Sequence, residues 1–218
     1  MSAIKVSAYR WVPPFAQGLV RDLRVRWALE EAGLPYEERL LDFRSAPDGY
    51  RKLQPFGQVP TFEENGLVLF ETGAIVLHIA ERSTLLLPPD PAARARTTSW
   101  MFAALNSVEP SIMSLIQIDM KFAGDATARP WREAAVDSVK GRLQSVAAWL
   151  GGRDYLEDRF AAGDLLMVTV LRILRHTDLV TGIPVLAAYV SRCEARPAFQ
   201  RALAAQMAVF AENAPTAA

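Results

Sequence analysis

The stretch that decides the fold spans residues 54–75 and reads QPFGQVPTFEENGLVLFETGAI. Two short segments in it, 60–64 and 67–70, flank the dipeptide Asn65-Gly66. Asn-Gly is the strongest short signal for a hairpin, because both central positions of the favoured turn need a positive φ. The two segments are therefore predicted to be antiparallel strands.

The residues before this stretch predict a strand, a helix and a second strand. Apolar and polar side chains alternate over residues 4–9, which is the period of a half-buried strand. A helix is predicted at 19–32, ended by Gly33, and a strand at 36–41 completes a βαβ unit. The face of this helix opposite its apolar residues carries a charged row, namely Asp22, Arg26 and Glu30.

The residues that follow the hairpin have helical patterning. A helix is predicted at 72–81, with Thr72 placed to cap it. Residues 83–93 hold three prolines and no helical periodicity, which is typical of a linker. Most of the remaining chain has helical patterning, with a kink expected at Pro110. The predicted organisation is an α/β domain, a linker and an all-helical domain, at 1–82, 83–93 and 94–218.

Composition excludes several classes of protein. The 218 residues are 51% hydrophobic and 22% charged, with 24 basic and 24 acidic side chains, which is typical of a soluble globular chain and not of a nucleic-acid-binding protein. The single cysteine, Cys193, excludes an internal disulfide and a multi-thiolate metal site. The first residues lack the apolar stretch of a signal peptide. We therefore expect a cytoplasmic protein without nucleic-acid or membrane partners.

Residues 54–62, together with 66–75, resemble the cytosolic glutathione S-transferase (GST) superfamily, of the bacterial type. The family pattern there is N-P-x-G-[KQ]-V-P-x-L, a hairpin, and then E-[ST]-x-A-I. The resemblance continues at FAAGDLLM, residues 160–167, and at RPAF, residues 196–199. It implies a thioredoxin-like α/β N-terminal domain joined to an all-α C-terminal helical domain, in a homodimer.

The resemblance also implies a binding site for glutathione, used as a co-substrate. Val59, held before a cis Pro60, would pair through its backbone with the tripeptide, as an added strand does. Glu71 and Thr72 would receive the γ-glutamyl end at a helix N-terminus, and Gln58 the glycyl or cysteinyl part. The simpler interpretations are that Val-Pro only starts an edge strand and that Thr72 only caps a helix.

The resemblance requires a group that holds the glutathione sulfur as a thiolate. Lowering a thiol pKa by about two units needs about 2.7 kcal/mol, which one or two hydrogen bonds to the charged form supply. Members of the family use a Tyr near the end of the first strand, or a Ser or Cys near the start of the first helix. Residues 10–22 contain no Ser, Thr, Cys or Tyr, so Tyr9 is the first candidate. A backbone amide at Gln17 or Gly18 is the alternative.

The co-substrate pocket implied by the resemblance lies between the first loop and the first helices of the second domain. Trp11 and Phe15 would wall it from the loop, and Phe102 and Asn106 from the helices. The predicted activity is transfer of glutathione to a small electrophilic, hydrophobic co-substrate, as in detoxification, with no metal and no tightly bound cofactor. The alternative is a GST-like binding or regulatory protein that has kept the fold without the chemistry.

Overall fold

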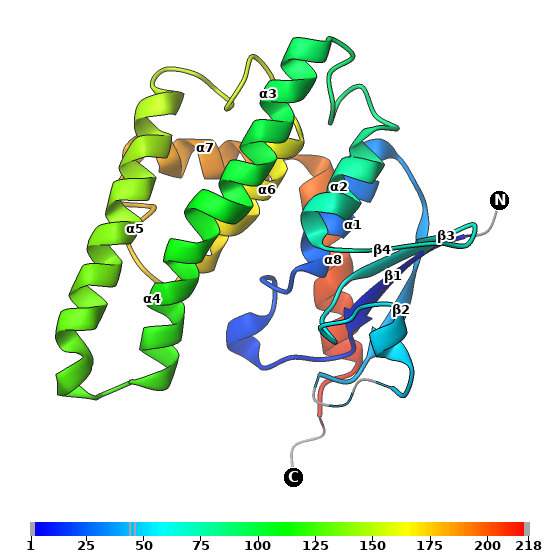
Figure 1. Cartoon of the computed structure of the whole chain (residues 1–218), viewed down its shortest axis with the longest axis horizontal. Helices are drawn as coiled ribbons and strands as arrows, with labels where there is room; N and C mark the ends of the chain where they lie inside the picture. Colours follow the sequence, from blue (N-terminus) through cyan, green and yellow to red (C-terminus); the bar gives the residue numbers. More distant parts are fainter. Residues whose placement is uncertain (1–2, 44, 46, 216–218) are drawn as a thin grey trace. The chain divides into compact units, whose positions relative to one another are not determined.

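The computed structural model describes residues 3–43, 45 and 47–215 (Figure 1). The chain divides into two compact units. The first unit consists of Met1–Leu87 together with Ala195–Ala218, and the second of Pro88–Glu194. The end of the chain, which the sequence assigns to the helical domain, thus has its contacts with the first unit, and the domain boundaries at 82 and 94 stay a prediction.

A mixed sheet forms one layer of the first unit. Its strands have the order β2-β1-β3-β4, with β1 parallel to β2 and antiparallel to β3. The strands are β1 Ile4–Tyr9, β2 Tyr36–Leu41, β3 Thr61–Glu64 and β4 Leu67–Phe70. Asn65 and Gly66 have φ values of 48° and 84°, and β3 pairs antiparallel with β4, so the predicted hairpin is confirmed.

Three helices form the second layer of this unit and lie together on one side of the sheet in Figure 1. They are α1 Asp22–Ala32, α2 Thr72–Ala80 and α8 Pro197–Glu212. Trp27 of α1 and Phe199 of α8 are buried, with ring centroids 4.8 Å apart. The helix α1 ends as predicted at Gly33, which has φ 67°, but begins three residues later than expected, because residues 17–21 form turns.

Two sequence predictions about exposure are wrong. The polar face of β1 was expected to meet solvent, but Ser7 is completely buried, since Tyr50 from the short helix η2, Tyr50–Lys52, covers that face. In the charged row of α1, Asp22 and Arg26 are both 1% exposed, because they pair with each other. Both errors come from treating polar side chains as solvated, although buried ones are tolerated when they find partners.

The second unit is helical. Its α-helices are α3 Pro91–Phe102, α4 Glu109–Lys121, α5 Arg129–Leu150, α6 Ala162–Leu171 and α7 Pro184–Glu194. A π-helical turn, Ala103–Val108, joins α3 to α4 just before Pro110. Proline lacks an N–H and crowds the preceding turn, which accounts for the interruption where a kink was predicted. Within the described residues, no helix is long and apolar enough to cross a membrane.

The start of α3 lies inside the predicted linker. Asp90 accepts a hydrogen bond from the Ala93 N–H at 2.8 Å, and Pro91 occupies the first helical position. Proline is favoured there, because its missing N–H has no helical partner to lose. The prolines at 88 and 89 thus precede the helix and the proline at 91 begins it.

Asp164 organises the N-terminus of α6. Its carboxylate accepts hydrogen bonds from the N–H groups of Leu156 and Ala161 and from the Tyr189 hydroxyl, each at 2.9 Å. The neighbouring Gly163 lies where α6 meets α3, and a Cβ there would come within 2.7 Å of Trp100 Cβ. The start of α6 is therefore fixed by hydrogen bonds and by close helix packing.

Candidate functional site

The loop before β3 presents an unpaired stretch of backbone. The Val59-Pro60 peptide bond is cis, and both residues are buried. Among the described residues, nothing hydrogen-bonds to the N–H or the C=O of Val59. The Gln58 side chain next to it is exposed, while its backbone N–H donates to Gln54 Oε1 at 3.2 Å. An extended peptide can pair with such free backbone groups as an added strand does.

Buried hydroxyl groups anchor this loop on both sides. The Tyr50 hydroxyl lies 2.7 Å from the Gln58 carbonyl oxygen and 2.8 Å from Ser7 Oγ. Ser7 Oγ in turn accepts from the Thr61 N–H at 2.6 Å and from the Thr61 hydroxyl at 3.0 Å. Gln58 and Thr61 bracket Val59, so the two ends of the loop are joined to the same buried residue of β1.

The start of α2 differs from the predicted cap. Thr72 is the first residue of the helix and not its cap, which is Glu71, and Glu71 makes no side-chain capping bond. The buried Arg24 of α1 donates from Nη1 to Thr72 Oγ1 at 3.3 Å. The Thr72 oxygen thus acts as an acceptor, and its O–H hydrogen remains to be donated. A helix N-terminus, a hydroxyl donor and a nearby guanidinium together favour an anion.

Glu71 has an unusual backbone conformation, with φ 69° and ψ 117°. A non-glycine residue with positive φ is uncommon, and such strain is concentrated at functional sites. The Glu71 side chain is exposed next to the buried Thr72. The two residues therefore offer a carboxylate and a hydroxyl at one helix start, as the sequence predicts.

Tyr9 lies at the end of β1, beside the loop that carries Val59. Its half-buried side chain packs against the cluster of Leu41, Tyr50 and Val59, and its ring meets Phe43 edge-on at a centroid distance of 5.2 Å. Burial raises the pKa of the Tyr9 hydroxyl, and the Tyr50 and Asp22 charges raise it further. Because its pKa is raised, the hydroxyl is protonated near neutral pH. No described residue hydrogen-bonds to it, so its hydrogen can be donated to a ligand.

The alternative donors lie in the loop between β1 and α1. The Gln17 N–H, one of the two predicted backbone donors, already donates to the Pro14 carbonyl at 3.3 Å, and Gly18 has φ 74°. Both residues belong to the turns that precede α1. The Tyr9 hydroxyl thus has no hydrogen-bond partner among the described residues, whereas the Gln17 N–H already has one.

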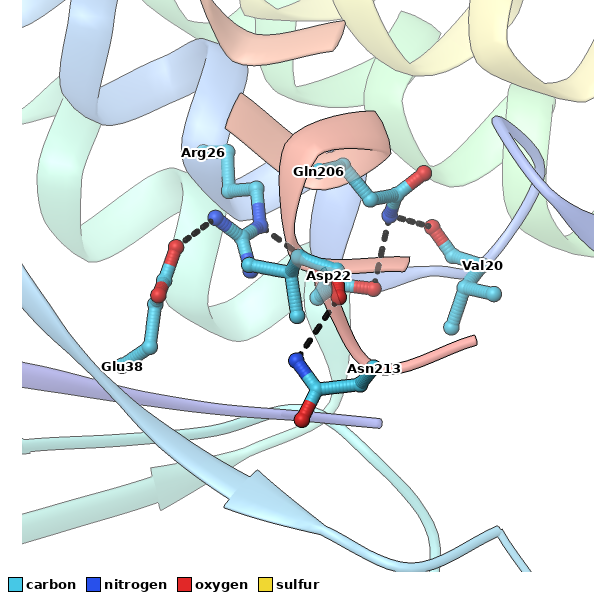
Figure 2. Close-up of polar contacts among 7 residues, drawn as sticks. Val20, Asp22, Arg26, Glu38, Gln206 and Asn213 are labelled. Carbon is cyan, nitrogen blue, oxygen red and sulfur yellow. Dashed lines mark hydrogen bonds and ion pairs between the residues drawn. The ribbon is translucent and has the colours of Figure 1, made fainter. Parts of the chain in front are cut away.

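A buried ion pair fixes the start of α1 (Figure 2). Arg26 Nε donates to Asp22 Oδ2 at 2.6 Å, and Arg26 also pairs with Glu38 of β2. The Gln206 amide of α8 donates to Asp22 Oδ1 at 2.8 Å and to the Val20 carbonyl at 3.2 Å. Burial opposes the charge of Arg26, but Asp22 and Glu38 outweigh it and raise the pKa of the guanidinium. Helix α1 is thus tied to both β2 and α8.

A cavity of about 410 Å³ opens beyond the C-terminal ends of β1 and β2. It is lined by Arg10, Trp11, Pro13, Asp42, Phe43 and Asn213. Of the pocket residues predicted in this unit, Trp11 lines the cavity, whereas the exposed Phe15 lies outside its lining. Phe102 and Asn106, predicted for the same pocket, lie in the second unit and are both exposed there.

Several site residues were missed by sequence reasoning. No sequence motif includes Ser7, Arg24 or Tyr50. Each is a polar residue in a segment where exposed polar side chains are common. Only their partners, which lie 43 to 54 residues away, reveal what they do. Across the described ranges, no group of three or more His, Cys, Asp or Glu side chains is arranged to hold a metal ion.

The fold and site define a class of protein: an α/β unit with a cis-proline loop before its third strand, followed by a helical region. Residues 17–81 match the family model of the glutathione S-transferase N-terminal domain. Glutathione S-transferase F14 of Arabidopsis thaliana is 31% identical over 194 residues, covering 79% of this chain and 75% of that protein. The chain belongs to the glutathione S-transferase family, and its first unit has the thioredoxin-like fold.

Two further similarities bear on function. The structure of a glutathione transferase from Burkholderia graminis, with two glutathione molecules bound per subunit, is 26% identical with a TM-score of 0.78, covering 92% of this chain and 87% of that one. A stringent starvation protein A homolog from Haemophilus influenzae is 25% identical over 182 residues, covering 81% of this chain and 82% of that protein.

The buried Asp22–Arg26 pair gives a prediction about stability. Replacing Arg26 with Met leaves a buried carboxylate without its cation, which we expect to lower the free energy of unfolding by about 3–5 kcal/mol. The double variant D22L/R26M removes both charges, and its free energy of unfolding should fall less than that of R26M alone. Urea unfolding measures both differences.

A matched control is the exposed pair Arg129–Glu133, which has the same spacing of four residues along a helix. There R129M should cost less than about 1 kcal/mol, because water screens exposed ion pairs. An R26M variant as stable as R129M would contradict the role given to the buried pair.

Proposed function

We propose that this protein binds glutathione and transfers it to a small electrophile. The observation that carries the proposal is the unpaired backbone of Val59, which offers one donor and one acceptor to an extended tripeptide beside the Tyr9 ring. Glutathione is a short peptide with a thiol, and the chain belongs to a family whose B. graminis member was crystallised with it. No tightly bound cofactor or metal is needed for this chemistry.

The γ-glutamyl end of glutathione is proposed to bind at the start of α2. Its carboxylate would accept from the Thr72 hydroxyl, which Arg24 leaves free to donate, and from the first N–H groups of the helix. Its ammonium group would pair with the exposed Glu71 carboxylate. Gln58 would reach the glycyl or cysteinyl part of the tripeptide. This arrangement needs only local charge, which fits a chain with no net charge.

The reaction is proposed to proceed from the glutathione thiolate. The Tyr9 hydroxyl would donate a hydrogen bond to the sulfur and stabilise its charge. The alternative is a loop amide at Gln17 or Gly18, and the Gln17 N–H would have to leave the Pro14 carbonyl to make this bond. The thiol proton leaves to solvent, and the sulfur forms a bond with an electrophilic carbon. The electron pair of the broken bond goes to the leaving group or to an adjacent electron-withdrawing group. The co-substrate is proposed to be small and hydrophobic, beside Trp11 and Phe15 of the first unit.

A second candidate function is a GST-like binding or regulatory protein without catalysis. Two observations favour it: the loop at 10–22 lacks the Ser or Cys that some members use, and one relative is named a stringent starvation protein A homolog and not a transferase. Binding with no thiol activation would identify this function. The cytoplasmic location and a role in detoxification remain predictions from the sequence.

Substitution of Thr72 tests glutathione binding. By calorimetric titration we expect T72A to raise the glutathione Kd roughly tenfold, because a hydrogen bond to a charged group is lost. T72S keeps the hydroxyl and should stay near the wild type. The control T97A removes a buried hydroxyl of the second unit that has no hydrogen-bond partner among the described residues. A wild-type protein that binds no glutathione at millimolar concentrations contradicts the proposed function.

The Tyr9 assignment is tested by Y9F. We expect the pKa of bound glutathione to rise by about one to two units, because a hydrogen bond to the thiolate is worth roughly 1.5–3 kcal/mol. Thiolate absorbance measures the pKa, and a conjugation assay measures the accompanying loss of rate near pH 6.5. Tyr155 of the second unit provides the control, Y155F. If Y9F keeps both the pKa and the rate, the donor is a backbone amide of the loop.

We propose a homodimer, as the resemblance implies. Phe56 and Phe70 are 63% and 37% exposed, with ring centroids 6.3 Å apart, beside the exposed Leu67 and Val68 of the edge strand β4. An exposed apolar edge strand is usually covered by a partner.

Sedimentation equilibrium at micromolar concentration should therefore give a dimer, and F56A should shift it toward monomer. F122A, at another exposed phenylalanine, should leave the mass unchanged. A wild-type monomer would contradict this proposal.

A further inference from the structure

The hydroxyl groups around the Val59 loop form a chain whose direction can be worked out. A carbonyl oxygen can only accept, so the single hydrogen of the Tyr50 hydroxyl goes to Gln58 O, 2.7 Å away. Tyr50 therefore has no hydrogen left for Ser7 Oγ, 2.8 Å away, and Ser7 must donate to Tyr50. The Ser7 oxygen then accepts from both Thr61 donors.

This assignment uses the hydroxyl hydrogens of all three residues, Thr61, Ser7 and Tyr50. The bonds run in one direction, from Thr61 through Ser7 to Tyr50, and end on the Gln58 carbonyl. Ser7 makes one donated and two accepted bonds, which is the full capacity of a hydroxyl. Ser7, Tyr50 and Thr61 are 0%, 3% and 0% exposed, so water does not compete for these bonds. Hydrogen bonds aligned in one direction polarise and strengthen one another.

We propose that Tyr50 is a positioning residue for glutathione, acting through the Gln58 carbonyl. This inference rests on the proposed function. The Tyr50 bond fixes the peptide plane between Gln58 and Val59, which also carries the Val59 N–H. That N–H is the donor offered to the tripeptide, so its direction is set by a hydroxyl that does not itself touch the ligand. Ser7 and Thr61 orient the Tyr50 hydroxyl and hold the other end of the loop.

The variant Y50F keeps the ring packing and removes the hydroxyl, and with it both the bond to the Gln58 carbonyl and the bond that Ser7 donates. We expect the KM and Kd for glutathione to rise roughly five- to tenfold, since one hydrogen bond that fixes the binding group is lost. The kcat at saturating glutathione should change by less than about twofold, because substrate and transition state lose the same binding. The pKa of the bound thiol should stay unchanged, which separates Tyr50 from Tyr9.

Two further variants separate positioning from a general loss of stability. S7A leaves the Tyr50–Gln58 bond in place but strips two buried Thr61 donors of their acceptor. It should therefore destabilise the protein more than Y50F and raise the glutathione KM less. The matched control Y189F removes a buried tyrosine hydroxyl that donates to Asp164 at 2.9 Å in the second unit. It should lower stability without changing the KM.

The outcomes are distinguishable. Wild-type protein that fails to bind glutathione overturns the proposed function itself. Wild-type binding with a Y50F KM no higher than that of Y189F overturns the role of Tyr50 alone. A rise in KM that follows the loss of stability across Y50F, S7A and Y189F also overturns it. The proposal is supported if Y50F has the weakest glutathione binding of the three variants while S7A is less stable than Y50F.

Discussion

A serine hydroxyl buried in the middle of β1 sets the constraint on which the candidate site depends. An unsatisfied buried hydroxyl costs about 1–3 kcal/mol, so Ser7 requires partners that only other segments can provide. Thr61 comes from β3 and Tyr50 from η2, and both meet Ser7 within 3.0 Å. The loop between these partners carries Val59. The satisfaction of one hydroxyl thereby fixes the backbone that we propose to hold glutathione.

Helix α1 has a comparable role on the other side of the sheet. Arg26 is held by Asp22 and Glu38, and Arg24 reaches Thr72 at the start of α2. Buried cations are tolerated only when paired and hydrogen-bonded, so each arginine ties α1 to a neighbouring element. The Gln206 amide adds α8 to this set through Asp22. The neutral overall charge of the chain therefore conceals strong local charges.

Much of the fold could be predicted from the sequence, because it rests on local signals. The Asn65-Gly66 turn, the Gly33 helix end and the break at Pro110 each follow from the backbone preferences of single residues. The glutathione-site residues came from a motif that lies within one continuous stretch, and their roles remain proposals. The wrong expectations, for Ser7, for the charged row of α1 and for the Thr72 cap, all concern polar side chains whose partners are distant in sequence.

The sequence by itself determined the elements, the family resemblance and the absence of a Ser or Cys donor between residues 10 and 22. Only the tertiary structure decided which polar groups are buried and what they bind. The physical reason is that turn and helix preferences act over a few neighbouring residues, whereas a buried hydroxyl or guanidinium is stabilised by whatever the fold places beside it. The direction of the hydroxyl chain from Thr61 to Gln58 follows from that placement, and from no pattern along the chain.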